Sequence, residues 1–189
     1  MAMSNKDTKV VTGRVRLSYC NLFQPRAAEE GGEEKYSCTI LIPKSDKATI
    51  AKVKAAIEAA KAAGADKLKD KNGKMPATVK IPVHDGDGEK PNGGEYGEEC
   101  KGHYVINASS KQKPGIVDSQ LNEIIDSTEV YSGCYGKVSI NFYAFNTKGN
   151  KGIASGLNNV QKIADGDYLG GRSRAEDDFE VENEEDLLG

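Results

Sequence analysis

The sequence predicts a mainly β domain with one clear helix inserted between strands and an acidic tail at its C-terminal end. Most apolar residues alternate with polar ones, which is the period of a strand with one buried face. Only the segment that begins near Ser45 has apolar residues three and four positions apart, the period of a helix. The 189 residues fit one domain of ordinary size, whose core needs no disulfide or metal.

The first two predicted strands form a hairpin with a long loop. The first strand covers residues 10–23 and has an apolar face opposite a basic one: Val11, Val15, Leu17 and Tyr19 share the first face, and Arg14, Arg16 and Ser18 the second. A polar turn with Pro25 and the pair Gly31 and Gly32 follows. The second strand covers residues 35–43, and its inward side chains are Tyr36, Cys38, Ile40 and Ile42.

A single amphipathic helix follows this hairpin. Ser45 or Asp46 can cap its N-terminus, and Gly64 ends it. Its apolar positions are Ile50, Val53 and Ile57. The lysines on the opposite side are interpreted as a solvated face, so we assign no site to the helix.

The rest of the chain alternates between strands and turns. Residues 85–102 are rich in glycine and acidic residues and are predicted to form a loop without regular structure. Strands follow at 101–109, 115–118, 131–145 and 151–163, which brings the total to six or seven, predominantly antiparallel. With one helix between strands and basic turns at 109–115 and 146–152, the pattern favours an OB-fold-like antiparallel barrel. We expect a flexible arm over 1–9, the barrel over 10–170 and a disordered acidic tail over 171–189.

The charges are unevenly distributed along the chain. Eight of the 29 acidic residues lie in residues 175–189, which contain no lysine or arginine. The preceding part therefore contains 21 acidic residues and all 26 basic ones. This body therefore has a net charge of about +5. A basic body with an acidic tail indicates a nucleic-acid partner for the body and an interaction or competing role for the tail.

The sequence favours a soluble, cytoplasmic protein. It contains no apolar run approaching the roughly 18 residues of a membrane span, and its N-terminus is polar. The four cysteines are far apart, without a C-x-x-C pair, and are interpreted as reduced thiols: Cys20, Cys38, Cys100 and Cys134.

Sites for metals, nucleotides and catalysis are not supported. The segment from Asp85 starts like a calcium loop, but Lys90 replaces the required glycine and Tyr96 the required glutamate. Cys100 and His103 have a spacing that zinc could use, yet no second ligand pair accompanies them. No phosphate-binding glycine motif or nucleophile elbow is present. Asp118 and Asp126 are interpreted as turn caps rather than general bases, so neither a cofactor nor an enzymatic activity is predicted.

The remaining candidate is the face of the strand over residues 135–145 that carries aromatic and basic side chains. Its even-numbered residues Val138, Ile140, Phe142 and Ala144 form an ordinary core face, whereas the odd-numbered side alternates rings with Lys137. Stacking of an unpaired base on a ring contributes roughly 1–3 kcal/mol, and lysines and arginines track the phosphates. The candidate DNA-binding residues are Arg14, Arg16, Tyr131, Tyr135, Lys137, Tyr143, Phe145, Lys111, Lys113, Lys148 and Lys151. Alternatively, some of these rings pack under the helix or close the barrel.

Several segments also resemble a known family. The runs "GRVRLSYCNLFQP", "YSCTILIPKSD", "IPVHDGD", "KPGIVD", "YSGCYGKVSINFYAFN" and "KGIASGLNNVQKI" are similar to bacteriophage single-stranded DNA-binding proteins, formerly classed as a family of unknown function. The resemblance covers about residues 10–165 and implies an OB fold with an acidic C-terminal tail. It implies sequence-tolerant binding of single-stranded DNA in phage replication, recombination and repair, in the host cell cytoplasm, without enzymatic activity.

The resemblance also implies a role for the tail in binding replication or recombination proteins. In related proteins the tail commonly ends in an aromatic residue that docks on partners, whereas this chain ends in Leu187, Leu188 and Gly189, with Phe179 as its tail aromatic. The candidate partner-binding residues are Glu176, Asp177, Asp178, Phe179, Glu184, Glu185, Asp186, Leu187 and Leu188.

The residues themselves leave other interpretations open. An RNA-binding OB module would use the same face, since nothing in the sequence identifies contacts to a 2′-hydroxyl. A non-catalytic protein-interaction domain would also use exposed tyrosines. The oligomeric state, monomer or homodimer, is not determined by the sequence.

Overall fold

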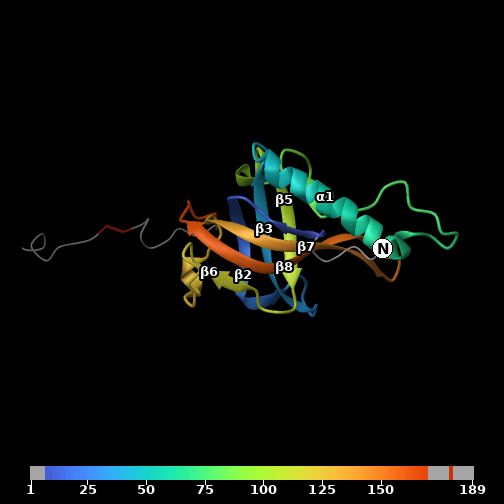
Figure 1. Cartoon of the computed structure of the whole chain (residues 1–189). Helices are drawn as coiled ribbons and strands as arrows, with labels where there is room; N and C mark the ends of the chain where they lie inside the picture. The colour runs from blue at the N-terminus through green and yellow to red at the C-terminus, as the bar shows by residue number, and fades with distance from the viewer. Residues whose placement is uncertain (1–6, 170–178, 181–189) are drawn as a thin grey trace, which may run out of the picture.

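The computed structural model describes residues 7–169 and 179–180, which form the strands and helices drawn in Figure 1. Within this part the strands are β1 (Lys9–Val11), β2 (Val15–Ala27), β3 (Glu34–Pro43), β4 (Val83–Asp85), β5 (His103–Ser110), β6 (Gly115–Val117), β7 (Tyr135–Thr147) and β8 (Asn150–Ala164). The helices are α1 (Lys47–Ala63) and the short α2 (Ala65–Leu68), with 3-10 turns η1 (Glu98–Cys100) and η2 (Ser127–Glu129).

Five strands close into a ring. The order β7-β2-β3-β5-β8 returns to β7 because β7 also pairs with β8 along almost its whole length. All neighbours in the ring are antiparallel except β5 and β8, which pair in parallel at Ser109 and Gly156. The short strands β1, β4 and β6 pair with β7, β5 and β8. The ring confirms the predicted mainly β, OB-like architecture with one clear helix.

The core lies inside the ring and follows the predicted alternation. Val138, Ile140, Phe142 and Ala144 of β7 are all buried. They join Cys38, Ile40 and Ile42 of β3 and Leu17 of β2 in one apolar cluster. Burial of this strip is the main favourable term for closing the ring, because each fully buried aliphatic or aromatic side chain contributes about 1.5–3 kcal/mol.

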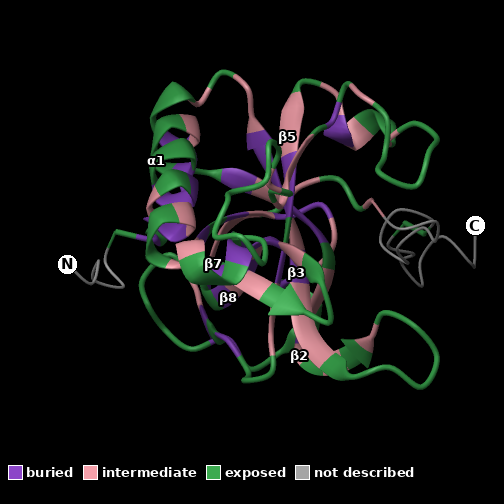
Figure 2. Ribbon diagram, turned by 90° about the vertical axis from the view of Figure 1, so that its right-hand side faces the viewer, coloured by how far each residue is buried: buried purple, intermediate pink, exposed green. Residues whose placement is uncertain are grey.

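Helix α1 covers one side of the ring with its predicted apolar face. Asp46 caps its N-terminus by accepting a hydrogen bond from the Thr49 amide at 3.1 Å. Val53 and Ile57 are buried beneath the helix, while its outer residues are exposed (Figure 2). The helix ends at Gly64, where a Cβ would overlap that of Ala144 on β7. Glycine therefore allows the helix end to approach the sheet closely.

The predicted first strand differs from the structure in two places. It is divided into β1 and β2, and Val10 is buried while Val11 is exposed. A β-bulge between Ser18 and Asn21 then shifts the alternation, so Ser18 is buried and Tyr19 is 72% exposed. A bulge inserts an extra residue into one strand, and alternation alone does not reveal its position.

The predicted first turn and the strand count also change. β2 continues through Pro25 to Ala27, which leaves 28–33 as the turn. The eight strands of the described residues exceed the six or seven predicted, because β1 and β4, with three residues each, are too short to show a period.

Candidate nucleic-acid interface

A shallow groove on the outside of the ring brings together two of the predicted site residues, Tyr143 and Lys111. The groove has a volume of about 320 Å³ and lies across β3, β5, β7 and β8. Its lining residues are Lys35, Ser109, Ser110, Lys111, Asn141, Tyr143, Gly156, Leu157 and Asn158. One ring, two cations and small polar groups therefore share a single concave surface.

Tyr143 is placed there by the β7–β8 pairing. It lies diagonally across from Gly156, and a Cβ on this glycine would lie 3.5 Å from Cε1 of the Tyr143 ring. The ring therefore packs over the bare backbone of Gly156. Tyr143 is nevertheless 44% exposed, which leaves ring surface available for stacking.

Lys111, one of the two cations of this groove, is weakly held. Lys111 Nζ lies 2.9 Å from a carboxylate oxygen of Glu33, and both side chains are largely exposed. The hydrogen bond from Lys111 lowers the pKa of Glu33, and the charge of Lys35 lowers it further. Exposed ion pairs contribute about 0–1 kcal/mol, so a phosphate can replace Glu33 at little cost.

A second group of predicted residues gathers at the opposite end of β7. The guanidinium groups of Arg14 and Arg16 lie 4.7 and 5.7 Å from the centroid of the Tyr135 ring. Arg16 also donates hydrogen bonds to the carbonyl oxygens of Gly133 and Asp167. Tyr135 and Tyr143 are eight positions apart on one strand, about 26 Å at the usual rise.

Tyr131 belongs to the same end of the ring. Its hydroxyl donates to Asp165 at 3.0 Å and accepts from the Gly166 amide at 3.1 Å. Lys162 Nζ lies 5.5 Å from the centroid of the Tyr131 ring, and the ring is partly buried against the core. These contacts connect Tyr131 to the segment that follows β8.

The other predicted side chains are spread around the ring. Lys137 is exposed on β7. Phe145 leans on Gly152 at the β7–β8 end, where a Cβ on that glycine would lie 3.4 Å from the ring. Lys151 donates to the Lys69 carbonyl oxygen, and Lys113 lies 5.5 Å from the centroid of the Phe23 ring. Lys148 occupies the tip of the β7–β8 turn with a φ of 51°.

The tail residues fall almost entirely outside the described part of the chain. Phe179 is 76% exposed. The other predicted tail residues, Glu176, Asp177, Asp178, Glu184, Glu185, Asp186, Leu187 and Leu188, lie outside the described residues.

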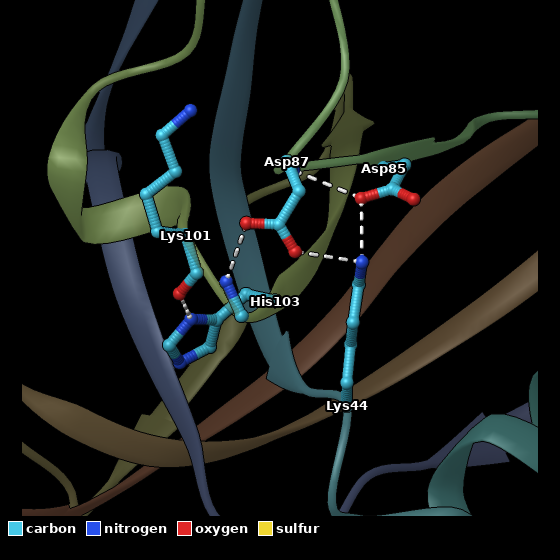
Figure 3. A network of polar contacts seen from close by, with 6 residues as sticks. Lys44, Asp85, Asp87, Lys101 and His103 are labelled. Atoms are coloured by element: carbon cyan, nitrogen blue, oxygen red, sulfur yellow. Dashed lines mark hydrogen bonds and ion pairs between the residues drawn. The ribbon is translucent and has the colours of Figure 1, made fainter.

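Residues 85–102 were predicted to lack regular structure, but they include the end of β4 and the turn η1. The segment 86–102 is anchored at its base. Lys44 Nζ lies 2.7 Å from Asp85 and 2.8 Å from Asp87, and the Gly102 amide donates to the second oxygen of Asp87 at 3.0 Å (Figure 3). The hydrogen bonds from Lys44 lower the pKa of both aspartates. A second groove of about 770 Å³ lies beneath this segment, against β2, β3 and β5. No pattern in the sequence indicates this groove, because its walls are distant along the chain.

The two aspartates that were candidates for general bases lie in turns. Asp118 accepts hydrogen bonds from the amides of Gln120 and Asn122, and Asp126 accepts one from the Thr128 amide. Both aspartates are therefore turn caps. Within the described residues no group of three His, Cys, Asp or Glu side chains is placed to hold a metal ion.

The four cysteines are free thiols. Burial raises the pKa of Cys134 to about 11. Burial similarly raises the pKa of Cys100, and the hydrogen bond with Cys38 raises that of Cys20. Thiols with raised pKa values are poor nucleophiles at neutral pH.

A five-stranded OB-like ring with an exposed tyrosine between cations defines a class of non-catalytic nucleic-acid-binding modules. The chain belongs to the family of the Enterobacter phage Enc34 ssDNA-binding protein, whose family model matches residues 8–188. It is 31% identical over 188 residues to "putative protein p50" of Acyrthosiphon pisum secondary endosymbiont phage 1, covering 95% of this chain and 98% of that protein. The phage family suggested by the sequence is thereby confirmed.

Solved structures agree with this assignment. The single-stranded DNA-binding protein of bacteriophage Enc34, solved in complex with ssDNA, is 28% identical with a TM-score of 0.71, over 87% of this chain and 91% of that one. The single-stranded DNA-binding protein gp2.5 of bacteriophage T7 is 15% identical with a TM-score of 0.60, over 93% and 96% of the two chains. At that identity the T7 protein supports the fold alone. Among the described residues no helix is long and apolar enough to cross a membrane.

Proposed function

We propose that this protein binds single-stranded DNA with little dependence on base sequence, by stacking bases on Tyr143 and holding phosphates with lysines. The observation that carries the proposal is the exposed Tyr143 ring, which lies in one groove with Lys35 and Lys111. Membership of a phage ssDNA-binding family supports DNA as the ligand.

Tolerance of base sequence follows from the chemistry of the groove. Every base has a π-face, so a tyrosine ring stacks on any of them, contributing about 1–3 kcal/mol. Lys35 and Lys111 act on the phosphates, which are identical at every position. Ser109 and Asn158 add small polar groups whose hydrogen bonds adapt to different neighbours.

The remaining predicted residues differ in the contact with DNA that their surroundings allow. Lys137, Lys148 and Lys151 supply further cations along β7 and its turn, and Lys113 lies near the β2–β3 end. Arg14, Arg16, Tyr131 and Tyr135 form a separate group. They would contact DNA only through the parts of their side chains that stacking within the group leaves exposed. Phe145 packs on Gly152 and serves chiefly to fix the β7–β8 turn.

The biological setting proposed is phage DNA replication, recombination and repair in the host cell cytoplasm. The protein would hold the displaced strand extended and protected, and the acidic tail would modulate DNA access and contact replication or recombination proteins. We propose this tail role from its eight acidic residues.

Substitution of Tyr143 tests the proposal. Y143A should weaken binding to an oligo-dT strand roughly tenfold, in line with the stacking contribution of about 1–3 kcal/mol, whereas Y143F should retain wild-type affinity. Binding is followed by quenching of tyrosine fluorescence, which the absence of tryptophan makes readable. Equal affinities of Y143A and wild type would contradict the stacking role. Competition by RNA of the same sequence separates a DNA preference from general single-strand binding.

A further inference from the structure

Two loops outside the groove of Tyr143 combine exposed aliphatic side chains with charges of one sign. Residues 118–129, which follow β6, contain four acidic residues and no basic one. Residues 69–81, which follow α2, contain four lysines and a single aspartate. We call them the acidic loop and the lysine loop.

The acidic loop exposes two large aliphatic side chains. Leu121 is 73% exposed and Ile125 is 83% exposed, whereas the adjacent Ile124 is buried. The Ile124 amide donates to the Ile116 carbonyl oxygen at 2.9 Å, which fixes the side of the loop that faces the core. Exposed apolar side chains that gather in one place indicate an interaction surface.

The acidic loop has a fixed conformation. One carboxylate oxygen of Asp118 accepts hydrogen bonds from the amides of Gln120 and Asn122, both at 2.9 Å. Leu121 lies in this turn with a φ of 69°, which is uncommon for a residue with a side chain. The turn therefore presents an exposed leucine in a strained conformation, although the leucine gains no packing within the chain.

The lysine loop is built in a similar way. Asp70 accepts hydrogen bonds from the amides of Asn72 at 2.8 Å and Lys74 at 2.9 Å. Met75 and Ile81 are its exposed apolar side chains. The two loops thus share an ordered turn and exposed apolar groups, and they differ in the sign of their charge.

The two loops lie at opposite ends of the molecule. Gln161 of β8 donates to the Asp118 carbonyl oxygen at 3.3 Å, and Lys151 of β8 donates to the Lys69 carbonyl oxygen at 3.1 Å. Lys151 and Gln161 are ten positions apart on one strand, about 33 Å at the usual rise. Figure 1 shows β6 on the left and the segment that follows α2 on the right. The loops of one chain therefore cannot pair with each other, whereas those of two copies can.

The charges of both loops are available to a partner. Among the described residues, no ion pair uses Lys71 or Lys74 of the lysine loop, or Glu123 or Glu129 of the acidic loop. All four side chains are exposed. A second copy of the chain thus offers each loop a surface of opposite charge that also carries apolar groups.

We propose that the acidic loop of one copy packs on the lysine loop of the next, so that copies associate head to tail and bind one DNA strand cooperatively. The inference rests on the proposed DNA-binding function. A contact between two different surfaces of identical chains extends into an open row rather than a closed dimer.

The contact acts between copies that are already bound to the same strand. Two short loops are small beside the roughly 1,200–2,000 Å² that stable interfaces bury. Attachment to one DNA strand raises the effective concentration of neighbouring copies to about the millimolar range, where a weak contact suffices. Cooperativity on a long strand is therefore the expected result, rather than a stable oligomer of the unbound protein.

A comparison of two DNA lengths tests this contact. Wild type is titrated onto poly-dT, which holds many copies, and onto an oligo-dT strand that holds one. L121N should lower the cooperativity factor on poly-dT roughly tenfold, because the contact loses a buried aliphatic side chain. Asparagine adopts a positive φ readily, so the turn is retained. Affinity for the one-copy strand should stay unchanged. V11T is the control, because Val11 is an exposed aliphatic residue on β1, outside both loops.

A mixing experiment identifies the head-to-tail arrangement. L121N/I125S damages the acidic loop alone, and K71E/K74E damages the lysine loop alone. On an oligo-dT strand that holds two copies, each variant by itself should bind without cooperativity. An equal mixture should recover part of it, because the intact acidic loop of one variant meets the intact lysine loop of the other. No recovery in the mixture would overturn the arrangement.

The one-copy strand separates failure of this inference from failure of the proposed function. If wild type binds that strand but L121N keeps wild-type cooperativity on poly-dT, the loop contact is wrong and the proposed function stands. If K71E/K74E weakens binding to the one-copy strand, the lysine loop contacts DNA and the inference is overturned. If wild type itself fails to bind oligo-dT, both are overturned.

Discussion

Gly156 shows how a single residue prepares the site. Because it lacks a side chain, the Tyr143 ring lies over the backbone of β8 and keeps nearly half of its surface exposed. A larger residue at this position would lift or displace the ring. Glu33 has the opposite effect on the neighbouring cation, since it pairs with Lys111 at 2.9 Å and competes with phosphate for it.

This arrangement predicts opposite effects for the two partners of that ion pair. K111A should weaken binding to oligo-dT and reduce the slope of log K against log salt by about 0.7, the value for one phosphate contact on a single strand. E33Q should tighten binding at low salt, because Lys111 no longer has a competing carboxylate. The measurement is a set of fluorescence titrations at several salt concentrations. K52A, on the exposed side of α1, is the control and should leave the slope unchanged.

At the scale of elements, the segment between β4 and β5 is the main difference from expectation. Its glycines and acidic residues predict an irregular loop, yet long-range contacts anchor it. Gly86 shows why glycine is needed: a Cβ there would overlap the Cys100 carbonyl oxygen. The composition of such a segment indicates that it is flexible. It does not identify the residues elsewhere in the chain, such as Lys44, whose contacts make it rigid.

Lys44 should therefore control the order of segment 86–102 more than the stability of the whole fold. K44M removes both ion pairs, so the amides of residues 86–102 should exchange hydrogen faster, while the melting temperature changes little because exposed ion pairs contribute about 0–1 kcal/mol. K61M, which breaks the Glu58 pair on α1, is the matched control. Unchanged exchange in K44M would show that the packing of Tyr96 against Leu41, Cys100 and Val105 suffices.

The same network defines a pH dependence. Lys44 lowers the pKa values of Asp85 and Asp87. Carboxylates with lowered pKa values stabilise the folded segment at a pH above the usual aspartate pKa. This stabilisation is lost as the pH falls through the lowered pKa values. Lower protection of the amides of residues 86–102, measured against their intrinsic exchange rate at each pH, should thus appear in wild type only at a pH below the ordinary aspartate range.

At the scale of the molecule, alternation and capping were enough to predict much of the fold. The β7 core face, the cap and end of α1, and the one-helix OB-like ring all follow from local patterns. The position of Tyr19 does not, because the bulge is held by Ser132, which is distant along the chain, together with the neighbouring Asn21. The candidate site is similarly divided. Tyr143 and Lys111 line one groove, whereas Tyr135 lies beside the two arginines, about 26 Å from Tyr143 along β7. The sequence identifies the aromatic and cationic side chains, but the closure of the strands into a ring decides which of them share a surface.

The charge asymmetry of the whole chain predicts that the tail competes with DNA. Residues 175–189 contain eight acidic residues, and the rest of the chain has a net charge of about +5. DNA phosphates would bind the same lysines as these acidic residues. Deleting 175–189 should therefore tighten binding to oligo-dT at low salt. The difference between the truncated and full-length protein should shrink as salt rises, because the Debye length falls from about 10 Å at 0.1 M to about 3 Å at 1 M.

A full-length control separates charge from chain length in this experiment. Replacing the eight acidic residues of 175–189 by their amides keeps the length of the tail and removes its charge. If competition is electrostatic, this variant should bind oligo-dT as tightly as the truncated protein at low salt. If only the truncation tightens binding, the tail acts by occupying space. If neither variant binds more tightly than wild type, the tail does not compete for the DNA-binding surface.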